Sequence, residues 1–473
     1  MVWTALQKYS TMFIHFISGI ILARLLMPYD YGCIGMLAIF MALAEAFIDG
    51  GFGSALIQKK RPTQEDYSTI FYWNLGMATV MYAILFASAP VISRFYNIPL
   101  LCDVLRVQGL VLFIYAFNIV QLNQLRKNLN FKLLSIVTIT TSVTALVVTI
   151  FMAYKGLGVW SLVVQNIITA AIPAIVFWFF IKWRPILVFS WKSFKELFSF
   201  GFYMFLTNLL NNLSVKIQGL LIGKIYSPVT MGYYSKAHNT ESLASESVSS
   251  IMTQVTYPLY AEAQNDLKQL AKMIKRLTMT IAYITFPLMF ILLLLAKPIF
   301  VLLYSDRWLA SVPYFQVLCV AGMGVSLTAV NTQAIAAIGK SKVMFVWTVL
   351  KRGIGITAIM VGLFLFGMKG LLAAVVFSNW FSYFVNIGLV SKHVGYRFWD
   401  QVRDIIPVTV VSVIAAVVSY GVGCFLHLGL YMDGLMKLFL YSAIYLGWSF
   451  ILKPEPYTYF LSVIPERFKF IKR

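Results

Sequence analysis

Stretches of about 20 mostly apolar residues recur along almost the whole chain, with short polar connections between them. An α-helix needs roughly this length of apolar sequence to cross the hydrocarbon core of a membrane. The pattern therefore predicts an all-α integral membrane protein. Thirteen stretches meet this criterion, near residues 3–26, 34–56, 68–92, 104–125, 133–153, 159–181, 199–223, 277–304, 312–337, 343–366, 369–390, 404–426 and 433–452.

One further segment, residues 234–257, is rich in Ser and Glu and is too polar for this criterion. An internal repeat nevertheless places it among the spans. Residues 21–32 contain an apolar run, a cation, a proline four residues later and a glycine four residues after that, and residues 221–232 repeat this spacing. The offset of 200 residues maps the polar segment onto the predicted second span at 34–56. Duplicated helical bundles are a common plan for membrane transporters.

With this segment included, the sequence predicts about fourteen transmembrane helices. Each copy of the repeat contains six, an even number, so both copies enter the membrane from the same side and are related by a pseudo-two-fold axis along the membrane normal. Helices 13 and 14 have no counterpart. The predicted parts are an N-terminal lobe at 1–183 (helices 1–6), a cytoplasmic linker at 184–198, a C-terminal lobe at 199–392 (helices 7–12), and helices 13–14 with a basic tail at 393–473.

The distribution of charge supports this number of helices. The chain contains 38 Lys and Arg and has a net charge of +21, although only 12% of its residues are charged, about half the share found in soluble proteins. With fourteen helices, 24 basic residues fall on one side of the membrane and 10 on the other. Because basic residues accumulate in cytoplasmic loops, both termini are predicted to be cytoplasmic. The positive charge is interpreted as a topology signal and not as a nucleic-acid-binding surface.

The sequence contains no motif typical of catalysis, of a metal site or of a cofactor. Its four cysteines are scattered and have no metal-binding or redox spacing. Residues 337–342 (AIGKSK) mimic the end of a phosphate-binding loop, but Ala334 stands where that motif requires its first glycine. The connections are too short for a soluble catalytic domain. The sequence therefore favours a transporter, without catalytic residues, metal or cofactor, over an enzyme.

An ordered series of segments resembles one known family. The segments are ILARLLMPYDYG (21–32), FIDGGFGSALIQKK (47–60), FYNIPL (95–100), LRKNLNFKLLS (125–135), GVWSLVVQN (158–166), LLIGKIYSPVTMGYYSKA (220–237) and YPLYAEAQND (257–266). Together they resemble the bacterial polysaccharide-unit flippases, the lipopolysaccharide and exopolysaccharide biosynthesis transporters of the multidrug/oligosaccharidyl-lipid/polysaccharide exporter superfamily. The resemblance covers roughly residues 1–400.

This resemblance implies a two-lobed bundle with a central cavity, alternating access, and a polyprenyl-diphosphate-linked oligosaccharide as substrate. It also implies a place in the bacterial cytoplasmic (inner) membrane, among membrane lipids, a polysaccharide polymerase and glycosyltransferases that build O-antigen, exopolysaccharide or capsule. The chain departs from the family in two respects. It starts almost inside helix 1, with a shorter lead, and helix 7 reads Lys216-Ile217-Gln218 where the family often has an Arg-x-x-Asp-like pair. A charge-pair role is therefore not transferred to Gln218.

Polar residues within the predicted spans are the candidate substrate-binding residues, because such groups are costly in lipid and usually face a cavity. In helix 7, Asn208, Asn212 and Lys216 recur every four residues and so share one helix face. As a cavity wall, this face would meet a diphosphate or sugar hydroxyls. The alternative is a contact between helices, with the asparagines hydrogen-bonding across it.

Four further cations are candidates for substrate binding. Arg24 and Lys224 are repeat counterparts at the predicted outer ends of helices 1 and 7, where an outer gate and ordinary snorkelling are both open interpretations. Lys351 and Arg352 lie about 12–15 Å into helix 11 from Lys342, at a rise of 1.5 Å per residue. They are candidate phosphate contacts on the cytoplasmic side, again with snorkelling as the alternative.

Three acids are candidates for binding a coupling proton or sodium ion: Glu45 in helix 2, and Glu241 and Glu246 in helix 8. Helix 8 carries too many Ser and Glu residues to face lipid, so it lines a water-filled cavity or is buried among other helices. Asp49 lies one turn after Glu45, directly before Gly50-Gly51, and is interpreted as a capping residue.

Two other functions compete with the flippase. A cation-coupled multidrug exporter would share the fold, and would be favoured by a carboxylate in helix 1, which this helix lacks. A membrane glycosyltransferase or polymerase would need catalytic residues in a sizeable external loop, and the loops here are short.

Overall fold

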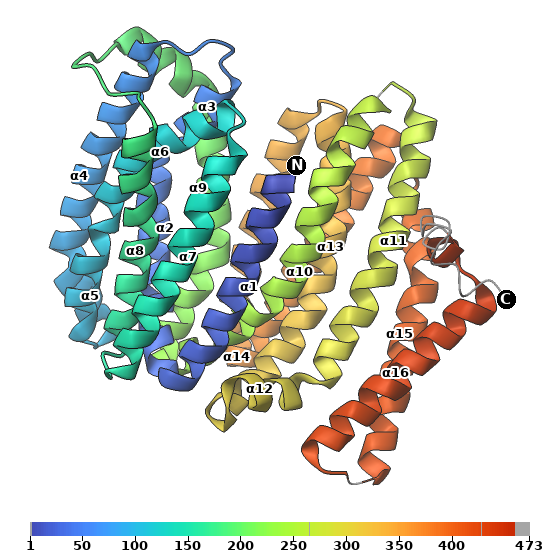
Figure 1. Cartoon of the computed structure of the whole chain (residues 1–473). Helices are drawn as coiled ribbons and strands as arrows, with labels where there is room; N and C mark the ends of the chain where they lie inside the picture. Colours follow the sequence, from blue (N-terminus) through green and yellow to red (C-terminus); the bar gives the residue numbers. More distant parts are fainter. Residues whose placement is uncertain (1, 264, 427, 459–473) are drawn as a thin grey trace. The chain divides into compact units, whose positions relative to one another are not determined.

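The computed structural model describes residues 2–263, 265–426 and 428–458, which are almost entirely helical (Figure 1). Two compact units, residues 1–235 and 236–473, are described separately. The first contains α1 (Val2–Leu25), α2 (Pro28–Asp49), α3 (Phe52–Gln58), α4 (Gln64–Tyr96), α5 (Leu100–Gly109), α6 (Val111–Lys127), α7 (Phe131–Tyr154), α8 (Val159–Phe180), α9 (Trp191–Ile225) and the start of α10 (Pro228–Glu262). The second contains the rest of α10, α11 (Leu267–Leu294), α12 (Ala296–Tyr304), the 3₁₀ helix η1 (Asp306–Ser311), α13 (Val312–Ala337), α14 (Ser341–Val394), α15 (Phe398–Leu426) and α16 (Leu430–Leu452).

All fourteen predicted spans are helical. Ten helical segments of the described chain are long and apolar enough to cross a membrane, and one of them, residues 343–394, covers two predicted spans. The remaining three predicted spans are the more polar helices α1, α9 and α10. The span expected at 277–304 is divided at Leu295 into α11 and α12. The last part of the predicted basic tail, residues 459–473, lies outside the described residues.

The long helix α14 is a hairpin whose two arms turn at Gly367. This residue has φ 62° and ψ −147°, a conformation that glycine adopts without a steric penalty. Gly362 and Gly370, on opposite sides of the turn, approach so closely that a Cβ on Gly362 would lie 2.5 Å from the Gly370 carbonyl oxygen. Farther along the arms, Lys351 donates a hydrogen bond to Asn386 at 2.7 Å. The two arms are therefore antiparallel and correspond to predicted helices 11 and 12.

The repeated proline–glycine segments contact each other within the first unit. A Cβ on Gly32 would lie 2.5 Å from the carbonyl carbon of Pro228, and a Cβ on Gly232 would lie 2.6 Å from that of Pro28. Real Cβ atoms essentially never come within 3.0 Å of another heavy atom. The first turns of α2 and α10 therefore cross backbone to backbone, in a reciprocal contact that only glycine permits at these two positions.

The first unit extends to Ser235 and so includes all of α9. Residues 184–198, predicted as a linker, lie within this unit. Part of that segment forms the first turns of α9, where Leu197 is buried in a core cluster with Phe52 and Phe71. A second close approach lies nearby, since a Cβ on Gly51 would fall 2.7 Å from the carbonyl carbon of Gly201. These contacts of α9 with α3 and α4 include it in the first unit.

Basic residues collect at the end of the first unit where α3, α4, α6 and α9 meet, here called the basic end. Lys59 forms salt bridges of 3.0 Å with the buried Asp66 and with the exposed Glu196. Burial alone would lower the pKa of Lys59, but the two carboxylates raise it above its ordinary value. Lys127 donates to the carbonyls of Leu56, at 3.1 Å, and of two later residues at the C-terminus of α3, where a cation also complements the helix dipole.

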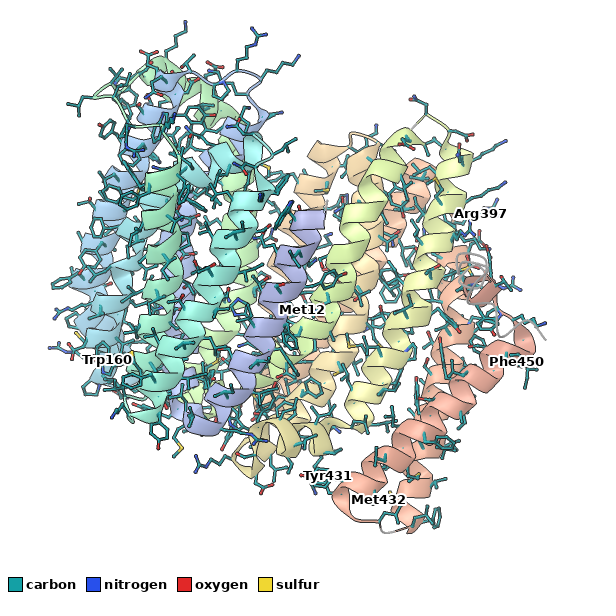
Figure 2. The ribbon with its side chains drawn as sticks, in the orientation of Figure 1. Met12, Trp160, Arg397, Tyr431, Met432 and Phe450 are labelled. Atoms are coloured by element: carbon teal, nitrogen blue, oxygen red, sulfur yellow. The ribbon has the colours of Figure 1, made fainter. Side chains whose placement is uncertain are left out.

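The last two helices, α15 and α16, present large apolar side chains at their surface. Tyr431, Met432 and Phe450 of α16 are 50%, 61% and 56% exposed, and Figure 2 shows all three at the outside of that helix. Phe425 of α15 is also exposed. A soluble protein rarely leaves such a continuous apolar surface uncovered. This surface is what a helix pair surrounded by lipid requires.

Candidate functional site

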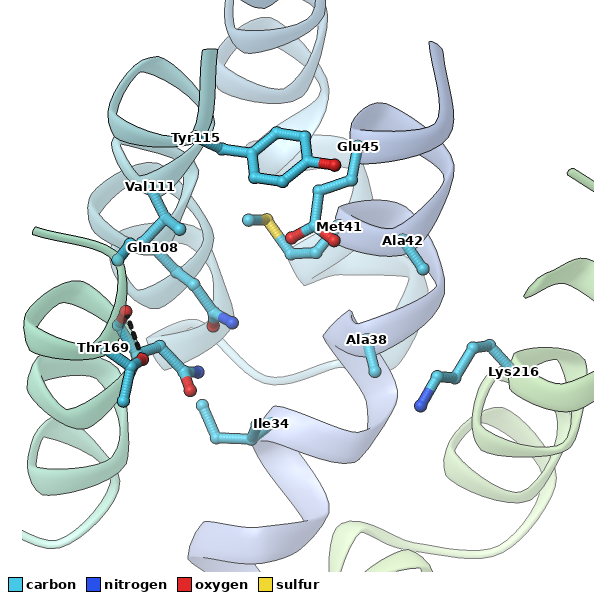
Figure 3. A pocket seen from close by; sticks show the side chains of 12 residues that line it. Ile34, Ala38, Met41, Ala42, Glu45, Gln108, Val111, Tyr115, Thr169 and Lys216 are labelled. Atoms are coloured by element: carbon cyan, nitrogen blue, oxygen red, sulfur yellow. Dashed lines mark hydrogen bonds between the residues drawn. The ribbon is translucent and has the colours of Figure 1, made fainter. Parts of the chain in front are cut away.

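A cavity of about 400 Å³ opens within the first unit, between α2, α5, α6, α8 and α9 (Figure 3). This volume lies in the range of small-molecule binding sites. Half of its lining residues are apolar and half are polar. They are Ile34, Ala38, Met41, Ala42, Glu45, Gln108, Val111, Tyr115, Asn166, Thr169, Ala170 and Lys216.

Helix α2 forms one wall of this cavity and uses its two faces differently. From Ile34 to Glu45, its lining residues recur at helical spacing and so share one face, over about 16 Å at 1.5 Å per residue. Gly32 and Gly35 lie on another face, where α9 and α10 approach closely: a Cβ on Gly219 would lie 2.6 Å from the Gly35 carbonyl oxygen. The glycine face therefore fixes the position of α2, and a neighbouring face lines the cavity.

Lys216 and Glu45 line this cavity from two different helices. The ammonium group of Lys216 extends from α9 toward Ala38 of α2, and Glu45 lies beside Tyr115 farther along the cavity (Figure 3). Among the described residues, neither side chain has a hydrogen bond, and no salt bridge of 4.0 Å or less joins them. Both charged groups are thus available to a bound molecule, one as a donor and the other as an acceptor.

Four neutral polar residues complete the lining, and their hydrogen-bonding capacity differs. The Thr169 hydroxyl donates to the carbonyls of Gln165 and Asn166, each at 2.9 Å, so its proton is used within α8. The Gln108 side-chain oxygen is buried and has no partner among the described residues. The site can therefore exchange hydrogen bonds with hydroxyl or amide groups and can bind an anionic group through Lys216.

Asp49 lies one turn beyond Glu45 and has a structural role. Its two carboxylate oxygens accept from the backbone N–H groups of Gly51 and Gly53, both at 3.3 Å. These bonds satisfy donors at the start of α3, as carboxylates commonly do at helix N-termini. The interpretation of Asp49 as a capping residue is confirmed.

The other predicted residues of the first unit lie outside this cavity. Asn208 and Asn212 share α9 with Lys216 but do not line the cavity, and Arg24 is exposed near the end of α1. Lys224 donates to the Phe95 carbonyl at 2.5 Å and lies 4.4 Å from the centre of the Phe95 ring. Lys224 therefore links the ends of α9 and α4, at the end of the unit opposite the basic end.

The remaining predicted residues belong to the second unit. Lys351 donates to Asn386, which in turn donates to Thr332 of α13 at 2.9 Å. Its neighbour Arg352 is half-buried on the same arm of α14. Lys351 thus takes part in a polar network between α13 and α14.

Glu241 and Glu246 lie on α10 in very different environments. Glu241 is buried against Gly322 of α13, and one of its carboxylate oxygens has no hydrogen-bond partner among the described residues. Glu246, by contrast, is exposed. The polar helix α10 therefore buries one of its two candidate acids within the second unit.

Several polar residues that line the cavity or lie buried in a helix were not singled out from the sequence. Gln108, Tyr115, Asn166 and Thr169 line the cavity, and the only available signal was an isolated polar residue in an apolar span. Lys236 of α10 was counted as a topology signal, yet it is only 4% exposed and lies 4.0 Å from the centre of the Tyr304 ring. Within the described chain, no group of three or more His, Cys, Asp or Glu residues could hold a metal ion.

Comparison with known proteins identifies the family. Residues 21–313, more than half of the 473 residues, match the family described as polysaccharide biosynthesis protein. The chain belongs to this family. The resemblance to the polysaccharide-unit flippases of the exporter superfamily is thereby confirmed.

Relatives of this polysaccharide biosynthesis protein carry names of the same kind. The present chain is 25% identical over 350 residues to the teichuronic acid biosynthesis protein TuaB of Bacillus subtilis, and the alignment covers 73% of this chain and 72% of TuaB. It is 22% identical over 432 residues to the lipopolysaccharide biosynthesis protein WzxC of Escherichia coli, covering 89% and 86%.

Solved structures identify the fold of this polysaccharide biosynthesis protein. An inward closed structure of the lipid II flippase MurJ matches 96% of this chain and all of its own, with a TM-score of 0.74 and 13% identity. An inward-facing multidrug resistance MATE family transporter matches 82% of this chain and 94% of its own, with a TM-score of 0.63 and 16% identity. The fold is the two-lobed, all-α fold of these membrane transporters. The family match and this fold together identify the protein as a transporter, and the glycosyltransferase or polymerase alternative is not retained.

Proposed function

We propose that this protein transfers polyprenyl-diphosphate-linked oligosaccharide units from the cytoplasmic to the outer leaflet of the bacterial cytoplasmic membrane. The glycan enters the cavity while the polyprenyl chain stays in lipid, and the lobes at 1–183 and 199–392 alternate between inward-open and outward-open states. Both termini lie in the cytoplasm. The exported units serve O-antigen, exopolysaccharide or capsule synthesis, together with glycosyltransferases and a polysaccharide polymerase.

The chemistry of the cavity in the first unit supports this proposal. A sugar offers many hydroxyl groups, each of which donates and accepts hydrogen bonds, and a diphosphate offers negative charge. The cavity supplies amides at Gln108 and Asn166, a phenol at Tyr115, and an ammonium group at Lys216 that has no salt bridge of 4.0 Å or less among the described residues. This ammonium group can donate charge-assisted hydrogen bonds to an anionic ligand, which are stronger than those between neutral groups.

The position of Lys216 in the cavity is the observation that carries the proposal, and we propose that this lysine binds the diphosphate of the substrate. A lysine side chain that only reached for the membrane surface would extend toward the interface, whereas this one lines the cavity with Ala38 and Glu45. Asn208, Asn212, Arg24, Lys224, Lys351 and Arg352 stay proposed as further contacts along the substrate path.

The energy for transport comes from an ion gradient or from removal of the product, and the membrane potential assists. Moving one negative charge outward, away from a negative interior, releases about 2.3 kcal/mol per 100 mV. Glu45, Glu241 and Glu246 are the proposed ion-coupling groups. Glu45 lines the same cavity as Lys216. The substrate and the coupling ion can therefore compete for this cavity, or bind together, with the substrate at Lys216 and the ion at Glu45.

The proposal is tested by complementation of a bacterial strain that lacks its own polysaccharide-unit flippase. Lys216→Ala is expected to abolish surface polysaccharide, and Lys216→Arg to restore part of it. Lys195→Ala is the matched control, because Lys195 is an exposed cation on the same helix outside the cavity. All three proteins must be present in the membrane at equal amounts. Full activity of Lys216→Ala would rule out the role of this cation in substrate binding.

A cation-coupled multidrug exporter is the second candidate function. The acid Glu45 in the cavity favours it, since a carboxylate can bind a cationic drug or a proton in turn. Resistance of cells to cationic dyes separates the two functions: an exporter raises resistance and depends on Glu45, whereas a flippase leaves it unchanged and depends on Lys216.

A further inference from the structure

A second cavity lies on α14, in the second unit, and has no part in the function proposed above. It is a groove of about 380 Å³ between the two arms of the hairpin, near the end where the hairpin begins and finishes. Val343 and Trp347 line it from the first arm, and Val385, Gly388 and Lys392 line it from the second. Each set recurs at helical spacing, so the groove runs along both arms.

Polarity changes in one direction along this groove. One mouth of the groove is formed by Lys392 and His393, in the last turn of the second arm, just before the terminating Gly395. Val385 lies seven residues farther into the span, which corresponds to about 11 Å at 1.5 Å per residue. The groove therefore has a cationic mouth at the end of a span and an apolar floor toward its middle.

The position of Trp347 places the mouth of the groove at the level of the lipid headgroups. The 38% exposed indole of Trp347 lies one turn inward from Val343, and tryptophan concentrates at membrane–water interfaces. Among the described residues, no acidic side chain lines the groove, so none there balances the charge of Lys392. Basic pockets between transmembrane helices are a known means of binding anionic lipid headgroups.

Gly388 keeps the groove open. It is exposed, and a Cβ built on it would meet no heavy atom within 4 Å. This differs from Gly362 and Gly370 of the same hairpin, which bring the two arms together. A larger side chain at Gly388 would thus enter empty space, and it would fill the groove without forcing the arms apart.

We infer that this groove binds one anionic phospholipid, with the phosphate at Lys392 and His393 and an acyl chain along Val385, Gly388 and Trp347. A phospholipid fits this groove because its charged headgroup would lie at the cationic mouth and its acyl chain would lie along the apolar floor, the same orientation as that of a lipid in the surrounding leaflet. The inference does not depend on the transport function. A bound lipid at this position would hold the two arms of α14 together from outside, as an integral part of the second unit.

Photolabelling of the purified full-length protein tests this inference. The probe is phosphatidylglycerol with a diazirine in its acyl chain, in nanodiscs of phosphatidylcholine, and the labelled peptides are identified by mass spectrometry. Labelling is expected within 343–347 and 385–393, with competition by unlabelled phosphatidylglycerol and not by phosphatidylcholine. Gly388→Leu is expected to remove this labelling. Gly353→Leu, at an equally open position on the first arm that does not line the groove, is expected to leave it unchanged.

The charge requirement has its own pair of variants. Lys392→Gln is expected to lower labelling about fivefold, the effect of roughly 1 kcal/mol per basic residue near an anionic headgroup. Lys369→Gln, an exposed lysine near the turn of the same hairpin, is expected to have no effect. Equal labelling by a phosphatidylcholine probe, or unchanged labelling of Gly388→Leu, would overturn the inference. Stronger competition by a polyprenyl phosphate than by phosphatidylglycerol would also overturn it, since the occupant would then be an isoprenoid.

Discussion

Replacing Gly32 by alanine tests the reciprocal contact between the repeated proline–glycine segments. The new Cβ would lie 2.5 Å from the carbonyl carbon of Pro228, while ordinary contacts of this kind begin at 3.4 Å. The first turns of α2 and α10 must therefore separate by at least about 0.9 Å, and by more because the Pro228 carbonyl oxygen lies nearer still and, as backbone, cannot rotate away. Overpacking of this kind typically costs about 1–3 kcal/mol, and we expect Gly232→Ala to cost a similar amount because its contact with Pro28 is the counterpart.

The assay is the free energy of unfolding of the detergent-purified protein, measured by titration with a denaturing detergent. Gly76→Ala is the matched control, because a Cβ on Gly76 of α4 meets nothing within 4 Å. It should be neutral or stabilising, by up to about 1 kcal/mol, since alanine is the better helix former. Because Gly32 and Gly232 form one crossing, the double variant should cost less than the sum of the two single variants. If Gly32→Ala were no less stable than Gly76→Ala, the close backbone crossing would be refuted.

Three further predictions concern stability, measured in the same way. Lys127→Met removes the cation that binds the carbonyls at the end of α3 and should lower the free energy of unfolding by about 1–3 kcal/mol. Lys60→Met, at an exposed loop position, should change it by almost nothing, and equal effects of the two variants would contradict the capping role of Lys127. Asp66→Ala should cost about 3 kcal/mol, because its buried carboxylate caps α4 and pairs with a lysine, and Glu196→Ala should cost less than about 1 kcal/mol, because its side chain is 57% exposed. Gly362→Leu should separate the two arms of α14 and reduce the yield of folded protein, and a normal yield would show that the arms are not in backbone contact.

The positions of the helices were largely predictable from the sequence. Lipid requires long apolar segments, so the length of each stretch predicts a span directly. The polar helix α10 fails this criterion, and the 200-residue repeat recovered it. The extent of the first compact unit depends on packing, which the length of apolar stretches does not predict: residues at the start of α9 contact α3 and α4.

The candidate site was predicted only in part. Lys216 and Glu45 were selected because charge within a span is costly, and both line the cavity. Their neighbours Gln108 and Asn166 were missed, because the faces of α5 and α8 that line a cavity are decided by the packing of those helices. For Asn208, helical spacing correctly predicts which residues share a face, but not how far along the helix the cavity extends.

The crossing of α2 and α10 has a consequence for engineering this protein. Its geometry is set by main-chain atoms at Gly32, Pro28 and their counterparts, so it makes no demand on side chains elsewhere around α2. Positions such as Ile34 and Met41, which line the cavity and lie away from both Gly32 and Gly35 around the helix, can therefore be randomised in a library without disturbing this crossing. Selection from such a library for growth on a foreign glycan would turn the recognition surface into an independently adjustable part.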